Sequence, residues 1–125
     1  MKNNINTLVV CSKEEALKLK EEFRKVSSEI NIKFSVDNYK EALEIINREK
    51  TQLDAIIIDG TLKDQNILYL LTNYQEEILL SRTIILDNIK LDCYNLAASD
   101  YQLFNVLSKD YKINELVYSL KAIKN

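Results

Sequence analysis

Histidine is absent from this chain of 125 residues, and so are proline and tryptophan. Without histidine there is no histidine-activated nucleophile and no histidine-bound metal ion, and Cys11 and Cys93 are too few for a cysteine- and histidine-ligated zinc site. The two cysteines lie far apart in the sequence and do not indicate a disulfide. Glycine occurs once, at Gly60, so asparagine must supply much of the turn chemistry. These absences exclude several classes of enzyme and metal protein.

Charge of one sign and long apolar runs are also lacking. Lysine and arginine together number 17 against 19 acidic residues, a net charge of −2, and no basic stripe indicates nucleic-acid binding by this chain alone. No apolar run approaches the roughly 18 residues of a membrane span, and no leader precedes the first apolar segment. Apolar residues make up 46% of the chain, enough for one core. We therefore expect a single cytoplasmic domain over residues 1–125, without membrane contact.

Five short segments predict strands. The segments 7–11, 55–59, 83–87 and 104–108 are mostly apolar, as in strands that helices cover on both faces. The segment 30–36 alternates Ile32, Phe34 and Val36 with polar residues, which predicts an edge strand with one face in water. Alternation of strands with helices implies a doubly wound α/β fold with a parallel sheet and helices on both faces. With 30–36 at the edge, the strand order is 2-1-3-4-5.

The helices between the strands are marked by apolar residues at helical spacing. A short helix also fits residues 91–98. Two helix starts carry the capping-box pattern, Ser12 with Glu15 and Asn38 with Glu41. The apolar positions that define the helices are Ala16, Leu19, Phe23 and Val26; Ala42, Leu43 and Ile46; Ile67, Leu70, Leu71 and Tyr74; and Ile113, Leu116, Val117, Leu120 and Ile123.

Polar side chains gather where the predicted parallel strands end. Ligand chemistry in open α/β sheets occurs at this edge, which makes Asp59 a candidate site residue. An aspartate before a glycine is also ordinary turn chemistry, so Asp59 and Gly60 fit either interpretation. The residues brought to the edge are Cys11, Ser12, Asp59, Asp87, Asn88, Ser108 and Lys109.

The segments LVVCS, AIIIDG, IILDN and VLSKDY together resemble the receiver domain of two-component response regulators, over essentially the whole chain. The resemblance implies the CheY-like, flavodoxin-like fold and a part in phosphorelay signal transduction. It places Asp59 at the phosphoacceptor position and Lys109 at the lysine that contacts the phosphoryl group. Val106 falls at the switch position that the family often fills with an aromatic residue. The chain would also suit the N-terminal part of a longer regulator.

Three positions depart from the family's pattern. Cys11 and Ser12 replace the acidic pair that holds Mg²⁺, Asp87 replaces a hydroxyl residue, and Asp110 replaces a proline. An ionised carboxylate at Asp87 cannot donate to a phosphoryl oxygen and repels its charge. Rescue of the metal site by Glu14 or Glu15 is disfavoured, because both belong to the first helical turn. We expect an atypical receiver, or pseudo-receiver, that needs no cofactor, is not an enzyme and is phosphorylated poorly or not at all; a phosphorylatable receiver using Asp59 remains the alternative.

Further expectations concern the lysine, the first cysteine and the partners. We expect Lys109 to bridge Asp59 and Asp87 in a permanent ion network. A less favoured alternative makes Cys11 the phosphoacceptor of a phosphotransferase-type domain, although CSKEEAL lacks the glycines of a phosphate loop. No glycine-rich turn supports a flavin or nucleotide site. The resemblance implies a histidine kinase or regulatory protein as partner, or self-association through the family's helix 4, strand 5 and helix 5 face, where the available tyrosines are Tyr94, Tyr101, Tyr111 and Tyr118.

Overall fold

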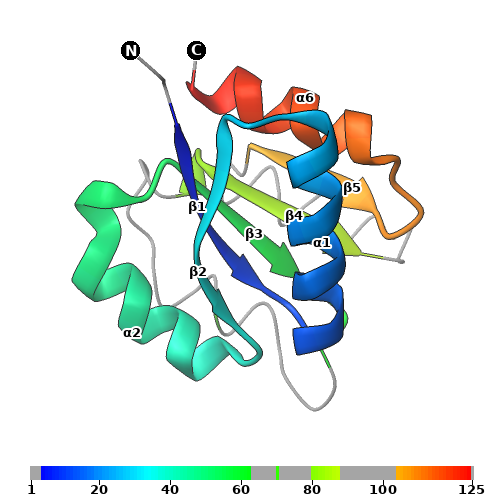
Figure 1. Cartoon of the computed structure of the whole chain (residues 1–125). Helices are drawn as coiled ribbons and strands as arrows, with labels where there is room; N and C mark the ends of the chain where they lie inside the picture. The colour runs from blue at the N-terminus through cyan, green and yellow to red at the C-terminus, as the bar shows by residue number, and fades with distance from the viewer. Residues whose placement is uncertain (1–3, 63–69, 71–79, 88–103, 125) are drawn as a thin grey trace.

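A five-stranded parallel sheet in the order β2-β1-β3-β4-β5 forms the centre of the computed structural model (Figure 1). This confirms the predicted fold class and strand order. The structure describes residues 4–62, 70, 80–87 and 104–124. Of the predicted helix marked by Ile67, Leu70, Leu71 and Tyr74, only Leu70 lies among these residues, and the predicted helix at 91–98 falls outside them. The strands are β1 (Ile5–Val10), β2 (Ile30–Val36), β3 (Ala55–Asp59), β4 (Thr83–Asp87) and β5 (Asn105–Ser108); the helices are α1 (Lys13–Val26), α2 (Tyr39–Glu49), the 3₁₀ turn η1 (Lys50–Gln52) and α6 (Ile113–Lys124).

Helices cover the sheet on both faces. The helices α1 and α6 lie on one face, and α2 lies on the other (Figure 1). Every residue of β3 and β4 is buried, which explains why these strands are nearly continuous apolar runs. A buried isoleucine such as Ile57 or Ile84 contributes about 1.5 to 3 kcal/mol through its burial. Among the described residues, no helix is long and apolar enough to span a membrane.

Two helices begin at the caps that the sequence predicts. The Ser12 hydroxyl accepts a hydrogen bond from the Glu15 amide at 3.1 Å, and the Asn38 side chain accepts one from the Glu41 amide at 2.9 Å. Each cap satisfies an amide that the helix itself leaves without a partner, worth about 1 kcal/mol. The caps therefore fix the residues at which α1 and α2 begin.

The edge strand β2 departs from a regular strand at Lys33. Ile32 pairs with Thr7, but the next β1 residue, Leu8, pairs with Phe34, so Lys33 is an extra residue in the ladder. The bulge reverses the side-chain alternation. Ile30 and Ile32 pack with the α1 and α6 layer, whereas Phe34 and Val36 pack with the α2 layer. The edge position is as predicted, but the prediction of one wet face is wrong, because the exposed side of β2 changes face at the bulge.

Candidate functional site

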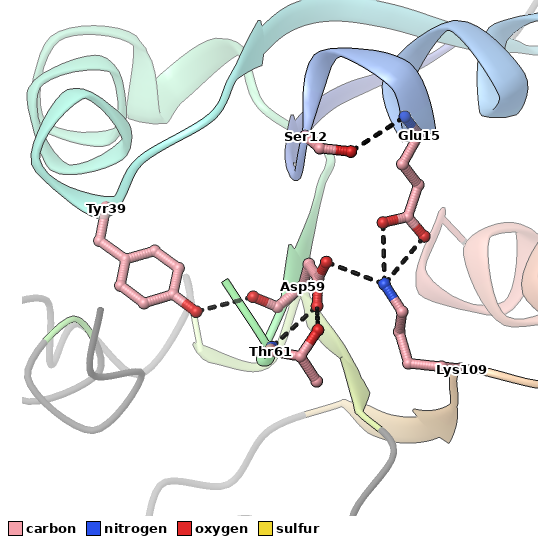
Figure 2. Close-up of polar contacts among 6 residues, drawn as sticks. All are labelled: Ser12, Glu15, Tyr39, Asp59, Thr61 and Lys109. Carbon is pink, nitrogen blue, oxygen red and sulfur yellow. Dashed lines mark hydrogen bonds and ion pairs between the residues drawn. The ribbon is translucent and has the colours of Figure 1, made fainter. Parts of the chain in front are cut away.

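The carboxyl edge of the sheet brings together charged groups from three separate elements (Figure 2). Asp59 ends the central strand β3, Lys109 follows β5, and Glu15 lies in the first turn of α1. Since all strands are parallel, β3 and β5 deliver their last residues to the same edge. Asp59 and Lys109, 50 residues apart in sequence, therefore meet as the strand order predicts.

The ammonium group of Lys109 lies between two carboxylates. Its Nζ donates to Asp59 Oδ2 at 2.8 Å and to both oxygens of Glu15, at 2.9 and 3.2 Å (Figure 2). The side chains are mostly buried, with 21% of Lys109 and 7% of Asp59 exposed. We expected Lys109 to bridge Asp59 and Asp87. The contact with Asp59 is present, but the second partner is Glu15, which reaches the site from α1.

The second oxygen of Asp59 is occupied as well. Thr61 donates to Asp59 Oδ1 through its backbone amide at 2.8 Å and through its hydroxyl at 2.6 Å. The buried Tyr39 hydroxyl donates to the backbone carbonyl of Asp59 at 2.7 Å. Sequence reasoning missed both residues. The position of Thr61, two residues after an aspartate, is the local signal for its bond, while nothing in the sequence points to Tyr39.

These contacts determine the protonation of the site. Burial by itself raises the pKa of Asp59, but the hydrogen bonds from Lys109 and Thr61 outweigh it and hold the pKa below its ordinary value. Burial lowers the pKa of Lys109, yet its hydrogen bonds to Asp59 and Glu15 reverse the effect and leave that pKa raised. Asp59 is thus a stabilised anion beside a stabilised cation at neutral pH.

Cys11 lies at the end of β1 next to this site, but its thiol is buried. Burial raises the pKa of Cys11 to about 12, and the nearby charges of Glu15 and Asp59 act in the same direction, with Lys109 opposing them. The thiol therefore stays protonated near neutral pH. Since the thiolate is the nucleophile, a buried and protonated thiol has low reactivity.

Gly60, the single glycine of the chain, has a close neighbour that leaves no room for a side chain. A Cβ at Gly60 would come 2.5 Å from Asp87 Oδ2 and 3.2 Å from both Asp87 Cγ and Ile85 Cγ2. Asp87 is buried at the end of β4, and the Gly60 amide donates to the Leu86 carbonyl at 2.8 Å. The turn interpretation is confirmed, since Gly60 and Thr61 form a turn, and the close neighbour adds a steric reason for glycine. The Asp87 carboxylate fills the space that a side chain at position 60 would need.

The other predicted positions have simpler surroundings. Val106 is half-buried against the α2 layer, and the Ser108 hydroxyl accepts from the Asp110 amide at 3.1 Å. The Ser12 side chain caps α1. Asn88, Cys93, Tyr94 and Tyr101 lie outside the described residues. Tyr111 is half-buried beside α1, and Tyr118 on α6 is 78% exposed.

Neither residue at the magnesium position of the receiver pattern, Cys11 or Ser12, offers a carboxylate. Cys11 presents a protonated thiol, and the Ser12 hydroxyl is used by the helix cap. Mg²⁺ prefers carboxylate oxygens in octahedral geometry. Glu15 and Asp59 supply carboxylates, but Lys109 lies between them, and the part of the chain that the structure describes holds no cluster of three acidic, cysteine or histidine residues placed to bind a metal.

No protein-family model matches the chain, and no curated protein matches it either. Solved structures do. The receiver domain of a Francisella response regulator has 21% identity and a TM-score of 0.77, with 97% of each chain covered. A DNA-binding response regulator of the LuxR family from Staphylococcus aureus has 18% identity and a TM-score of 0.78, with 97% of this chain and 99% of that one covered.

A third similar structure is named differently, as the adenylate cyclase from Rhodopirellula baltica, with 18% identity and a TM-score of 0.75 over 97% of this chain and 87% of that one. At these identities the likeness shows only that the backbones have the same fold. The same fold occurs in proteins with different functions. The chain has the CheY-like, flavodoxin-like fold of response regulator receiver domains.

Proposed function

We propose that this chain is an atypical receiver domain of two-component signalling that acts through protein interactions and not through Mg²⁺-dependent phosphorylation. The observation that carries the proposal is the position of Lys109, whose ammonium is held by Asp59 on one side and Glu15 on the other. A receiver lysine must be available to a phosphoryl group on the aspartate. Here the Glu15 carboxylate already pairs with the lysine that would otherwise contact a phosphoryl group.

The charges around Asp59 oppose phosphorylation in a second way. A phosphoryl group on Asp59 would add nearly two negative charges close to Glu15 and near Asp87. Two unit charges about 5 Å apart repel by roughly 3 kcal/mol at an effective dielectric of 20. Without a metal ion to screen them, these terms disfavour the phosphorylated form. Both oxygens of Asp59 also have donors already, so attack on a phosphodonor would cost hydrogen bonds to Thr61 or Lys109.

On this proposal the domain is a cytoplasmic binding module without a cofactor and without catalytic activity. Its partner is a histidine kinase or another regulatory protein, or a second copy that meets it at the α6 side of the sheet. The exposed Tyr118 on α6 is available to such a contact. The half-buried Tyr111 is less so, because it packs against the α1 layer.

One observation favours a working phosphoacceptor instead. Asp59 and Lys109 keep the direct contact that the receiver pattern requires, at 2.8 Å. A phosphorylatable receiver would then have to displace Glu15 from the lysine and accept a metal ion with few protein carboxylates. This is the second candidate function. It differs from the first in one measurable product, a phosphoryl group on Asp59.

Incubation with acetyl phosphate and Mg²⁺, followed by intact-mass measurement, separates the two. We expect no stoichiometric phosphoryl adduct under conditions that phosphorylate a competent receiver included as a positive control. An adduct that forms on the natural chain and is lost in Asp59→Ala would overturn the proposal. Beryllofluoride with Mg²⁺ should likewise leave the amide resonances around Asp59 unchanged.

A further inference from the structure

A groove runs between α1 and the edge strand β2, away from the Lys109 site. It consists of two adjoining hollows of about 370 and 410 Å³. Leu17, Lys20 and Ile32 line both hollows, so the two form one continuous depression along the helix. We call it the α1–β2 groove.

The bulge in β2 explains why this groove exists. In a regular strand Phe34 and Val36 would lie on the same face as Ile32 and fill the space beside α1. The extra residue Lys33 turns both of them to the α2 layer. Ser35 then lines the groove together with Ala16 of α1. A small polar side chain stands where a large apolar one would otherwise close the surface.

The groove has an apolar residue at its centre that the fold leaves uncovered. Leu17 is 70% exposed, the most exposed aliphatic residue among the large hydrophobic side chains in the part of the chain that the structure describes. Ile32 beside it is only partly buried, and Phe23 lines the hollow towards the start of β2. Leu17, Phe23 and Ile32 thus give the groove an apolar lining.

The charge around Leu17 is positive. Lys13 and Lys20 are exposed, line the groove and make no ion pair within the described ranges. One acidic side chain of α1, that of Glu21, also lines the groove, but it pairs with Arg24 at 2.6 Å. Lys13 and Lys20 therefore leave the groove with a net positive charge.

We propose that the α1–β2 groove binds an acidic segment of a partner protein, with an apolar side chain of that segment packed on Leu17 and its carboxylates near Lys13 and Lys20. Charge complementarity selects this occupant. The inference goes beyond the proposed function, since it does not depend on the state of Asp59.

Isotope-edited NMR with a defined probe tests the proposal. The probe is a short synthetic peptide in which glutamates flank leucines, and its controls are the same peptide with the leucines replaced by serine and with the glutamates replaced by lysine. We expect the acidic, leucine-containing peptide alone to shift the amide resonances of α1 and β2, and its affinity to fall as salt is added. No shift, or equal shifts with either control peptide, would overturn the proposal.

Matched variants distinguish binding in this groove from non-specific attraction of the peptide to exposed lysines. Leu17→Ser and Lys20→Glu should each weaken peptide binding about tenfold. Val26→Ser and Lys40→Glu make the same kinds of change at exposed positions that do not line the groove and should leave binding unchanged. All four positions are exposed, so folding should survive, as the melting temperatures will verify. Equal losses in both pairs, or self-association of the natural chain through the groove in analytical ultracentrifugation, would refute the proposal.

Discussion

The Asp87 carboxylate lies against the α-carbon of Gly60, where a Cβ would come within 2.5 Å of Oδ2. The one glycine of the chain and the carboxylate at the last residue of β4 thus belong to one packing arrangement. A receiver with a smaller hydroxyl residue at position 87 would leave more space for a side chain at position 60.

Replacement of Gly60 by alanine should therefore destabilise the domain. We expect Gly60→Ala to lower the free energy of unfolding by about 2 kcal/mol, because the added methyl group must displace Asp87 or the backbone. Urea denaturation followed by circular dichroism measures the loss. In an Asp87→Ala background the same change should cost about half as much, since only the contact with Ile85 remains. Equal costs in the two backgrounds would show that Asp87 is not the obstacle.

Removal of the Lys109 ammonium should cost more than removal of an exposed lysine. Lys109→Met leaves Asp59 and Glu15 facing each other without a counterion, and we expect a loss of about 2 kcal/mol in urea denaturation. Lys121→Met, at an exposed position of α6, is the control and should change stability by less than about 0.5 kcal/mol. Addition of Glu15→Gln to Lys109→Met should restore part of the loss. Additive effects of the two changes would contradict the bridging geometry.

Stability should be nearly constant through neutral pH and fall on both sides. The pKa of Asp59 lies below its ordinary 3.8, so its contribution is present above about pH 4 and is lost as the pH falls through the lowered value. The pKa of Lys109 lies above 10.5, so its contribution is complete below that pH and is lost as the pH rises through the raised value. The chain has no histidine to titrate between these limits.

The Cys11 thiol adds to the alkaline decline. Its pKa rises from 9.0 to about 12 on folding, so the unfolded chain releases this proton first and stability falls as the pH increases from 9 towards 12. Urea denaturation across a pH series will trace both limbs, and Asp59→Asn should flatten the acid limb while Cys11→Ala flattens the alkaline one. A step in the natural chain between about pH 6 and pH 7.5 would contradict this assignment.

An acidic pair introduced after β1 should create dependence on Mg²⁺. Ser12→Asp keeps a good helix cap, and Cys11→Asp puts a second carboxylate beside Asp59. The double variant should be less stable than the natural chain without metal, because it buries a charge near Asp59 and Glu15. Millimolar Mg²⁺ should raise its melting temperature and leave that of the natural chain unchanged. Ca²⁺ serves as the comparison ion; an equal response of both proteins to Mg²⁺ would refute the account of Cys11 and Ser12.

The fold followed from the sequence because its signals are local. Continuous apolar runs marked the covered strands, the alternation at Ile32, Phe34 and Val36 marked the edge, and Ser12 and Asn38 marked helix starts. The bulge at Lys33 was not predictable in this way. An extra residue leaves the spacing of apolar residues unchanged along the strand, and only its pairing with β1 reveals which face each side chain takes.

The site was predicted in part. The parallel order of the strands predicted that Asp59 and Lys109 lie together. It did not predict the second partner, because a long lysine side chain can reach several carboxylates. The capping pattern assigned the Glu15 carboxylate to the start of its own helix, whereas it binds Lys109, 94 residues away in sequence. A contact of that kind depends on how α1 lies on the sheet. Asp87 was placed beside the lysine for its charge, although its packing against Gly60 accounts for its position.

The bulge in β2 also affects what can happen at the open edge of the sheet. A flat, regular edge strand exposes a row of amides and carbonyls to which a strand of another molecule can add, and chains that do so grow into aggregates. Here the extra residue breaks the row in its middle and is a lysine, whose ammonium bonds Gln52 and lies over the Phe34 ring. Replacement of Lys33 by an apolar residue would leave the core intact and yet favour precipitation at high concentration.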